Sequence, residues 1–197
     1  MAGKYIHPLL FTVKNENVRI LRLTCVFGND FFSKNFLTEI INSAIVNKKI
    51  HLSSSFDSSK DYIDVDSVTN LMCQIAKGGT KRIYNIARGY NISNREIVFR
   101  IRGLTGCAVT SADDAPILVW PLIDNHRIKQ EFDFKPVHLM DKLEDLINKY
   151  KEFCPGAPRF HFDWLLIKSL LRNEENSVQE LPGFISIGFL LNPYEEM

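Results

Sequence analysis

The sequence has almost no net charge and no long apolar run, and both absences exclude classes of partner. Lys and Arg number 24 against 23 Asp and Glu, which leaves a net charge of +1 and no electrostatic indication of nucleic acid or an anionic membrane surface. No apolar stretch reaches the roughly 18 residues of a membrane span. The start MAGKYIHPLL also lacks the apolar run and cleavage site of a secretory signal. We therefore expect a cytoplasmic protein with no membrane and no nucleic-acid partner.

Cysteine and histidine are sparse and widely spaced. The four cysteines are Cys25, Cys73, Cys107 and Cys154. They form no close pair of the kind that zinc and thiol-redox sites use, so we expect small buried hydrophobic side chains in a reducing compartment. No two of the five histidines are four residues apart, the spacing that places two imidazoles on one helical face. These absences argue against a metal site, and the lack of a Gly-x-Ser-x-Gly motif removes support for an α/β-hydrolase.

A glycine-rich phosphate loop is also missing, although Gly103 and Gly106 stand three residues apart. Such a loop follows a strand and opens a helix, whereas these two glycines close a predicted helix, and Val109 stands where a third glycine would be needed. A run of acidic residues is the other candidate site, and its members are Asp57, Asp61, Asp64 and Asp66. Because they lack the ligand spacing and glycine of a calcium loop, we expect a solvated loop and a helix cap.

Hydrophobic residues make up 45% of the 197 residues, which is enough for a folded core and for one domain or a little more. The periodicity and turn residues predict strands at residues 18–27, 50–53, 61–66, 82–87 and 107–110. They predict helices at residues 31–47, 67–77 with Asp66 as the cap, 93–102 with a Ser93–Glu96 capping box, 125–131 and 139–150. The alternation of strands and helices predicts an α/β architecture with some parallel pairing.

The composition changes after Phe153, where Pro155, Gly156 and Pro158 interrupt the chain. Residues 163–172 look helical, and residues 181–191, LPGFISIGFLL, form an apolar stretch too short to span a bilayer. We expect this stretch to be a covering strand or packed terminal segment, with a self-association surface as the alternative.

Five segments, in this order, resemble one family, the NAD(P)-dependent nucleotide-sugar epimerases and dehydratases of the extended short-chain dehydrogenases. VRILRLTCVFGND is similar to the late Rossmann strand of that family, and FLTEIINSAIVNKKIHL to the helix and strand that follow it. SKDYIDVDSV is similar to the Arg-Asp-Tyr-Ile-x-Val-x-Asp-Val segment, and RIYNIARGYNISNREI to the later strand, turn and capped helix. LIDNHRIKQEFDFKP is similar to the Asp-x-x-Lys/Arg element. The resemblance covers residues 18–150 and implies the C-terminal part of a Rossmann-like fold without its N-terminal dinucleotide-binding unit.

Two functional parts of that family have no counterpart in the sequence. The first is the glycine-rich turn that binds the NAD or NADP cofactor. The second is the catalytic tyrosine followed four residues later by a lysine, which favours the phenolate. Tyr5, Tyr62, Tyr84 and Tyr90 are followed instead by Leu9, Asp66, Arg88 and Asn94. We therefore expect no catalytic residues in this chain and no stable binding of NAD or NADP by the chain alone.

The resemblance implies a cofactor-binding role for one residue and substrate-binding roles for four. Thr24 matches the strand end on the nicotinamide side, and Cys25 replaces an asparagine that hydrogen-bonds the substrate diphosphate. A thiol is the weaker donor. Asn35 and Phe36 match a pair that borders the nucleotide. Lys60 replaces an arginine, so it keeps the charge and loses the bidentate geometry. A nucleotide sugar should therefore bind weakly.

The resemblance divides the chain into residues 1–153, a partial Rossmann and substrate-binding lobe, and residues 154–197, an additional tail. We expect a truncated or split epimerase/dehydratase that retains the substrate-binding part and does not catalyse alone. The alternative is a non-catalytic binding or scaffold module that pairs with another chain. Strand 18–27 is apolar on both faces, so an exposed edge there would favour a homo-oligomer, or a separate N-terminal chain as partner.

Overall fold

The computed structural model describes residues 18–153. The predictions for the chain start, for residues 163–172 and for residues 181–191 lie outside this range, and so does the predicted tail 154–197. No helix within residues 18–153 is long and apolar enough to cross a membrane. The cellular location stays a prediction.

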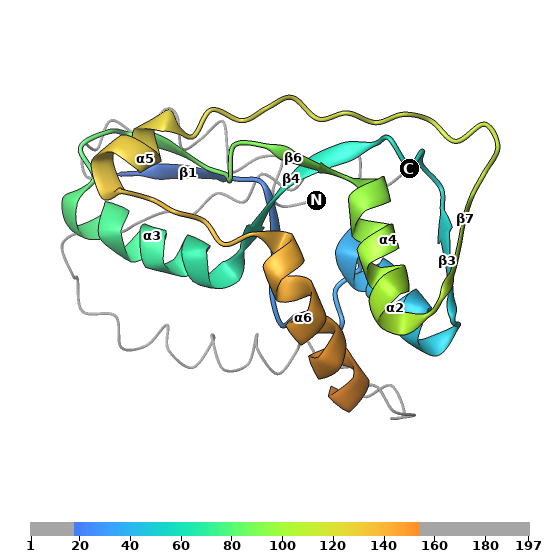
Figure 1. Ribbon diagram of the computed structural model, residues 1–197. Helices are drawn as coiled ribbons and strands as arrows, with labels where there is room; N and C mark the ends of the chain where they lie inside the picture. The colour runs from blue at the N-terminus through green and yellow to red at the C-terminus, as the bar shows by residue number, and fades with distance from the viewer. Residues whose placement is uncertain (1–17, 154–197) are drawn as a thin grey trace, which may run out of the picture.

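Strands and helices alternate along the described residues, as the sequence pattern predicts (Figure 1). The strands are β1 (Ile20–Leu23), β2 (Cys25–Phe27), β3 (Lys49–Leu52), β4 (Ser59–Asp64), β5 (Ile83–Ile86), β6 (Asn91–Ser93) and β7 (Ala108–Ser111). The helices are α2 (Phe36–Val46), α3 (Val65–Gly78), α4 (Asn94–Thr105), α5 (His126–Phe132) and α6 (Leu139–Phe153). Residues 112–125 form an extended connection that crosses from β7 to α5 along the top of Figure 1.

Most strand pairs are parallel. β1 pairs with β5, β2 with β4 and β3 with β7, all in parallel, and β6 joins the start of β4 in the antiparallel direction. Strands β1 and β2 come from one apolar run that divides at Thr24, so β1 lies in a different small sheet from β2. This arrangement confirms the predicted α/β class with parallel pairing.

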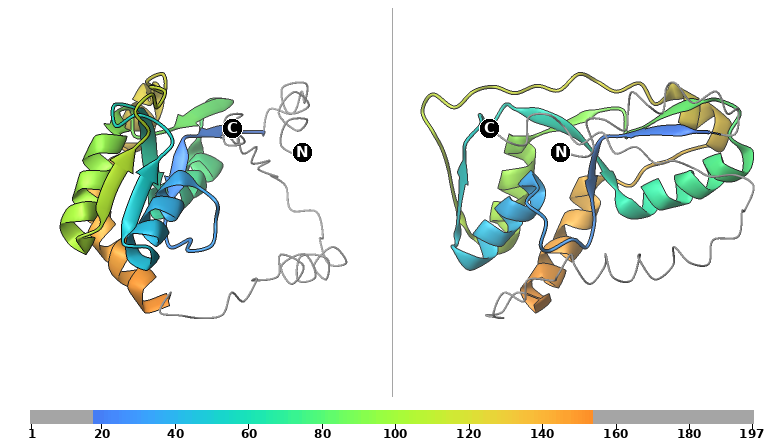
Figure 2. Two further views of the ribbon diagram at one scale, coloured as in Figure 1. Left: turned by 90° about the vertical axis from the view of Figure 1, so that its right-hand side faces the viewer. Right: turned by 180° about the vertical axis from the view of Figure 1, so that it is seen from behind.

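Two apolar clusters hold these layers together. The first lies around β1, β5, α3 and α5, at one end of the molecule in Figure 1, and consists of Leu21, Ile63, Val68, Leu71, Ile75, Tyr84, Ile86 and Ile128. The second joins α2, α4 and α6 to β3, β4 and β6. Figure 2 shows from two further sides how α6 lies beside α4.

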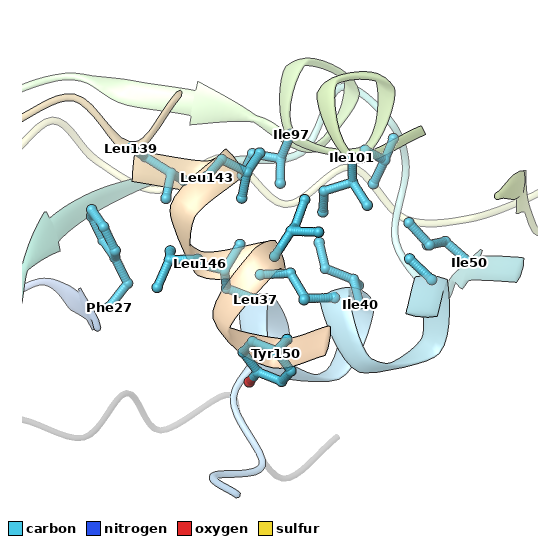
Figure 3. Packing of buried hydrophobic residues seen from close by; sticks show 14 of the residues in the cluster. Phe27, Leu37, Ile40, Ile50, Ile97, Ile101, Leu139, Leu143, Leu146 and Tyr150 are labelled. Carbon is cyan, nitrogen blue, oxygen red and sulfur yellow. The ribbon is translucent and has the colours of Figure 1, made fainter. Parts of the chain in front are cut away.

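Helix α6 supplies one wall of the second cluster. Leu139, Leu143, Leu146 and Tyr150 follow one another along the helix and face α2 and α4 (Figure 3). Each of these side chains is at most 5% exposed, and burying a side chain of this kind stabilises a fold by about 1.5–3 kcal/mol. The Tyr150 hydroxyl donates a hydrogen bond of 3.0 Å to the carbonyl of Asp30. The predicted amphipathic helix is thus confirmed, and the structure shows that it closes this cluster.

Two helix starts differ from the sequence predictions. Helix α2 begins at Phe36 and not near residue 31, because Asp30 accepts the N–H groups of Phe32 and Ser33 and so holds residues 30–33 in a turn. Helix α3 is capped by Asp64, whose side chain accepts the N–H of Ser67 at 2.9 Å. Asp66, the predicted cap, lies in the first turn instead.

Smaller corrections concern one glycine and one cysteine. The Ser93–Glu96 capping box is present, but α4 continues through Gly103 to Thr105, and Gly106 alone ends the helix with a φ of 70°. Cys107 is buried as predicted and Cys25 is half-buried, whereas Cys73 is exposed on α3. Cys154 lies outside the described residues.

Candidate functional site

A pocket of about 980 Å³ opens where β1, β2, the start of α2, the start of β4 and the 112–125 connection meet. All five residues that the sequence resemblance indicates line it: Thr24, Cys25, Asn35, Phe36 and Lys60. They come from separate parts of the chain, and the fold brings them together. Apolar side chains form most of the remaining wall, among them Leu23, Val26, Phe27, Val65, Val68, Met72 and Ile123.

Thr24 and Cys25 lie at the break between β1 and β2. The Thr24 N–H donates to the carbonyl of Ile86 at 3.3 Å, and its hydroxyl donates to the carbonyl of Asp61 at 2.8 Å. Cys25 is half-buried and pairs in register with Tyr62 of β4. The threonine hydroxyl thus joins the first strand pair to the second, and the thiol lies beside it on the pocket wall.

Asn35 and Phe36 begin helix α2 at the pocket. The side-chain oxygen of Asn35 accepts the N–H of Thr38 at 2.9 Å, and its amide nitrogen donates to the Ser33 hydroxyl. Both ends of this side chain therefore stabilise the start of the helix. Phe36, the next residue, is half-buried and contributes its ring to the pocket.

Lys60 is the basic side chain at the centre of this arrangement. Its ammonium group lies 5.3 Å from the centroid of the Phe36 ring and 6.0 Å from that of Trp120. These distances are within the range of cation–π attraction. None of the ion pairs among residues 18–153 involves Lys60, so its ammonium group contacts no carboxylate there. The pocket therefore holds a positive charge that a carboxylate of the described region does not neutralise.

Asp61 has a role that was not predicted from the sequence. A solvated acidic loop was predicted, but Asp61 is 2% exposed and accepts the N–H groups of Arg88 at 3.0 Å and Gly89 at 2.6 Å. Burial raises the pKa of Asp61 above its ordinary value, although these two hydrogen bonds and the Arg88 guanidinium act in the opposite direction. Asp64 is buried as well. The prediction was wrong for these two residues, because a count of aspartates does not show which ones face inward.

The turn after β5 is held from both sides. The Asp61 carboxylate accepts the N–H groups of Arg88 and Gly89 on one side of the turn. On the other side, the Asn125 side chain donates to the carbonyls of Ala87 at 3.0 Å and Arg88 at 2.6 Å. Arg88 is only 5% exposed and its guanidinium stacks 3.8 Å from the centroid of the Tyr90 ring. Burial lowers the pKa of Arg88, against the attraction of Asp61 and Asp141. This turn fixes one end of the strand pair from which the pocket wall is built.

Trp120 was likewise not predicted as a pocket residue. Its segment was predicted as irregular, but Val119 forms a bridge with Ser59. The apolar run ILVW between Pro116 and Pro121 was a usable signal, since such a run is typical of a strand at the edge of a sheet. Trp120 lines the same pocket as Phe36.

The chemistry of the pocket is that of a binding site with an apolar wall and few polar groups. Within residues 18–153, no three His, Cys, Asp or Glu side chains are grouped so that they could hold a metal ion. Among the donors on its wall are the Lys34 and Lys60 ammonium groups, the Cys25 thiol and the Thr24 hydroxyl, which already donates to the carbonyl of Asp61. An unpaired cation beside aromatic rings favours an anionic ligand with an uncharged ring.

Neither a scan against protein-family models nor a search of curated proteins gave a match for the sequence. Solved structures do match. A dTDP-glucose 4,6-dehydratase from Bacillus anthracis in complex with NAD is 20% identical with a TM-score of 0.59, covering 68% of this chain and 44% of that one. A UDP-glucose 4-epimerase from Thermotoga maritima with UDP-glucose is 16% identical with a TM-score of 0.60, covering 77% and 51%. An NAD-dependent NDP-hexosamine 5,6-dehydratase involved in tunicamycin biosynthesis is 12% identical with a TM-score of 0.62, covering 71% and 47%.

Residues 18–153 therefore share the α/β fold of part of these dehydratase and epimerase structures, in agreement with the fold that the resemblance predicted. The chain spans about half the length of these structures. At such low identities the likeness establishes the fold, and the role of each pocket residue has to be argued from its own chemistry.

Proposed function

We propose that the pocket binds a nucleotide sugar, with its diphosphate at Lys60 and its nucleotide beside Asn35 and Phe36. The observation that supports this most directly is the Lys60 ammonium group, which faces a mostly apolar pocket and contacts no carboxylate of the described region. A diphosphate supplies the missing anion, and the apolar wall suits a base or sugar ring.

Binding should be weak for three reasons that lie in the side chains. The Asn35 amide is already used at the start of α2. Cys25 offers only a thiol, which is a weak hydrogen-bond donor. Lys60 presents a point charge and cannot form the two parallel hydrogen bonds that an arginine gives to a phosphate.

The described residues do not fit a whole NAD or NADP molecule. Thr24 offers one hydroxyl on the nicotinamide side, and that hydroxyl already donates to Asp61. The sequence contains no glycine-rich turn of the kind that meets a dinucleotide pyrophosphate. With no Tyr-x-x-x-Lys pair in the chain either, the proposed activity is binding without catalysis by the chain alone. Measurable turnover of a nucleotide sugar by the purified chain with NAD would contradict this part of the proposal.

Titration with UDP-, GDP- and dTDP-sugars, by calorimetry or NMR, tests the binding site. Because a hydrogen bond to a charged group contributes about 1.5–3 kcal/mol, Lys60→Ala should weaken binding by about 10- to 100-fold. Lys49→Ala is the matched control, since it removes the same charge from an exposed position on β3. Tight binding that Lys60→Ala leaves unchanged would show that the diphosphate lies elsewhere.

One observation keeps a second function open, that of a scaffold module that pairs with another chain. Ile117, Val119 and Leu122 are 63%, 64% and 70% exposed on the 112–125 connection, where exposed apolar side chains are a common feature of protein interfaces. A pull-down from the native source, with the wild-type chain and a Leu122→Glu variant, distinguishes the two functions. A partner that binds only the wild type would favour the scaffold.

A further inference from the structure

The Lys60 ammonium lies near two aromatic rings that come from different parts of the fold. Phe36 is the first residue of α2, and Trp120 belongs to the 112–125 connection. With ring centroids 5.3 Å and 6.0 Å away, both rings attract the ammonium group. A lysine side chain otherwise samples many rotamers, so the position of its charge depends on what surrounds it.

Hydrogen bonds to β4 and β6 fix the position of Trp120. The backbone N–H of Trp120 donates to the carbonyl of Ser59 at 3.1 Å, and the backbone carbonyl of Trp120 accepts the side-chain amide of Asn91 at 2.6 Å. The Ser59 N–H in turn donates to the carbonyl of Leu118 at 2.9 Å. Ser59 directly precedes Lys60, so the backbone that carries the indole is bonded to the strand that carries the ammonium group.

We infer that Trp120 is a positioning residue, which together with Phe36 holds the Lys60 ammonium in the orientation that meets an anionic ligand. The inference rests on the proposed function for the identity of that ligand, a nucleoside diphosphate sugar. An ammonium group that is already oriented loses less side-chain entropy on binding. Trp120 therefore acts through Lys60, and its removal should weaken recognition of the diphosphate.

A double-mutant cycle tests this route of action. Wild type, Trp120→Leu, Lys60→Ala and the double variant are titrated with UDP-glucose and dTDP-glucose by calorimetry. Trp120→Leu should weaken binding about two- to fivefold, the equivalent of about 0.5–1 kcal/mol of cation–π attraction, and should have no further effect once Lys60 is alanine. Trp120→Phe should retain most of the affinity. Equal effects of Trp120→Leu with and without Lys60 would overturn the inference, because the indole would then act independently of the ammonium group.

A measurement without ligand separates this inference from the proposed function. In the wild-type chain, NMR should find the Lys60 ε-methylene protons shifted upfield by the ring currents of Phe36 and Trp120, relative to those of exposed Lys49. The shift should decrease in Trp120→Leu and in Phe36→Leu. A Lys60 signal like that of Lys49 in the wild type would overturn the inference, even if a variant fails to fold. If the shift is present but wild type binds no nucleotide sugar, the proposed function fails and the positioning role stands.

Discussion

Two glycines illustrate how differently single residues are constrained in this fold. Gly89 has a φ of 92°, its N–H donates to Asp61, and a Cβ there would lie 2.7 Å from the side-chain amide of Asn125. Gly103 lies within α4, and a Cβ there would have no atom within 4 Å.

The matched variants Gly89→Ala and Gly103→Ala should therefore change stability in opposite directions. We expect Gly89→Ala to lower the free energy of unfolding by about 1–3 kcal/mol, because alanine rarely adopts this backbone conformation. Gly103→Ala should raise it by about 0.5–1 kcal/mol through helix propensity. Urea denaturation measures the free energy of unfolding of both variants. An equal loss of stability in the two would show that the backbone at Gly89, in the turn after β5, does not require glycine.

At the residue scale, the family resemblance assigns positions along the whole chain, and the five residues that it indicates line one pocket. Their binding roles stay predictions. Asp61 and Trp120 were missed because their roles depend on neighbours distant in sequence, namely Arg88 and Gly89 for the carboxylate of Asp61 and Ser59 and Asn91 for the backbone of Trp120.

At the scale of elements, the start of α6 depends on the protonation state of one histidine. The Nδ1 atom of His138 accepts the N–H of Met140 at 3.1 Å, which requires a neutral acceptor at that nitrogen. Burial lowers the pKa of His138 below its ordinary 6.5, and Arg88 lowers it further, while Asp141 and Glu96 raise it.

Acid should therefore weaken the fold through His138. Below pH 6.5 the unfolded chain takes up a proton before the folded chain does, so the free energy of unfolding falls until the lowered pKa of the folded state is reached. His138→Asn keeps a side chain that can accept the N–H and removes the titration. We expect this variant to lose less stability than wild type between about pH 7.5 and about pH 5.

Urea denaturation at the two pH values measures this difference. His126→Asn, at an exposed histidine of α5, is the control and should lose as much stability as wild type. A His138→Asn variant with the same loss as wild type would show that another group causes the acid sensitivity.

Elements with strong local signals were predicted well. The Ser93–Glu96 capping box and the amphipathic pattern of α6 depend on residues three or four positions apart, so the sequence contains the whole signal. The predicted start of α2 was wrong because Asp30 holds residues 30–33 in a turn and Asn35 caps the helix at Phe36, whereas the apolar periodicity already begins before Phe36.

At the scale of the molecule, the strand edges carry the prediction of self-association. Among the described strands, β1 pairs only with β5, and β2 pairs only with β4. Three of the four residues of β1 are apolar and its Ile20 and Leu21 are fully buried, so an edge of this strand that residues outside 18–153 leave open would favour pairing with another chain. We expect the full chain to form a dimer or a larger oligomer.

Light scattering at several concentrations tests this prediction, on the full chain and on a version that ends at Phe153. The mass of the full chain should rise with concentration. A full chain that stays monomeric would contradict the prediction. If only the shortened version then aggregates, residues 154–197 cover the strand edge in the full chain.

The position of α6 also affects how the chain folds during synthesis. The Tyr150 hydroxyl bonds to the carbonyl of Asp30, a residue 120 positions earlier, and the helix fills the cluster that α2 and α4 begin. At translation rates of about 5–20 residues per second, on the order of ten seconds separate the synthesis of these two residues. During that interval the apolar face of α2 is without α6, its later packing partner. The cluster can therefore reach its native packing only after α6 has been synthesised, and until then this face is exposed to contacts with other molecules.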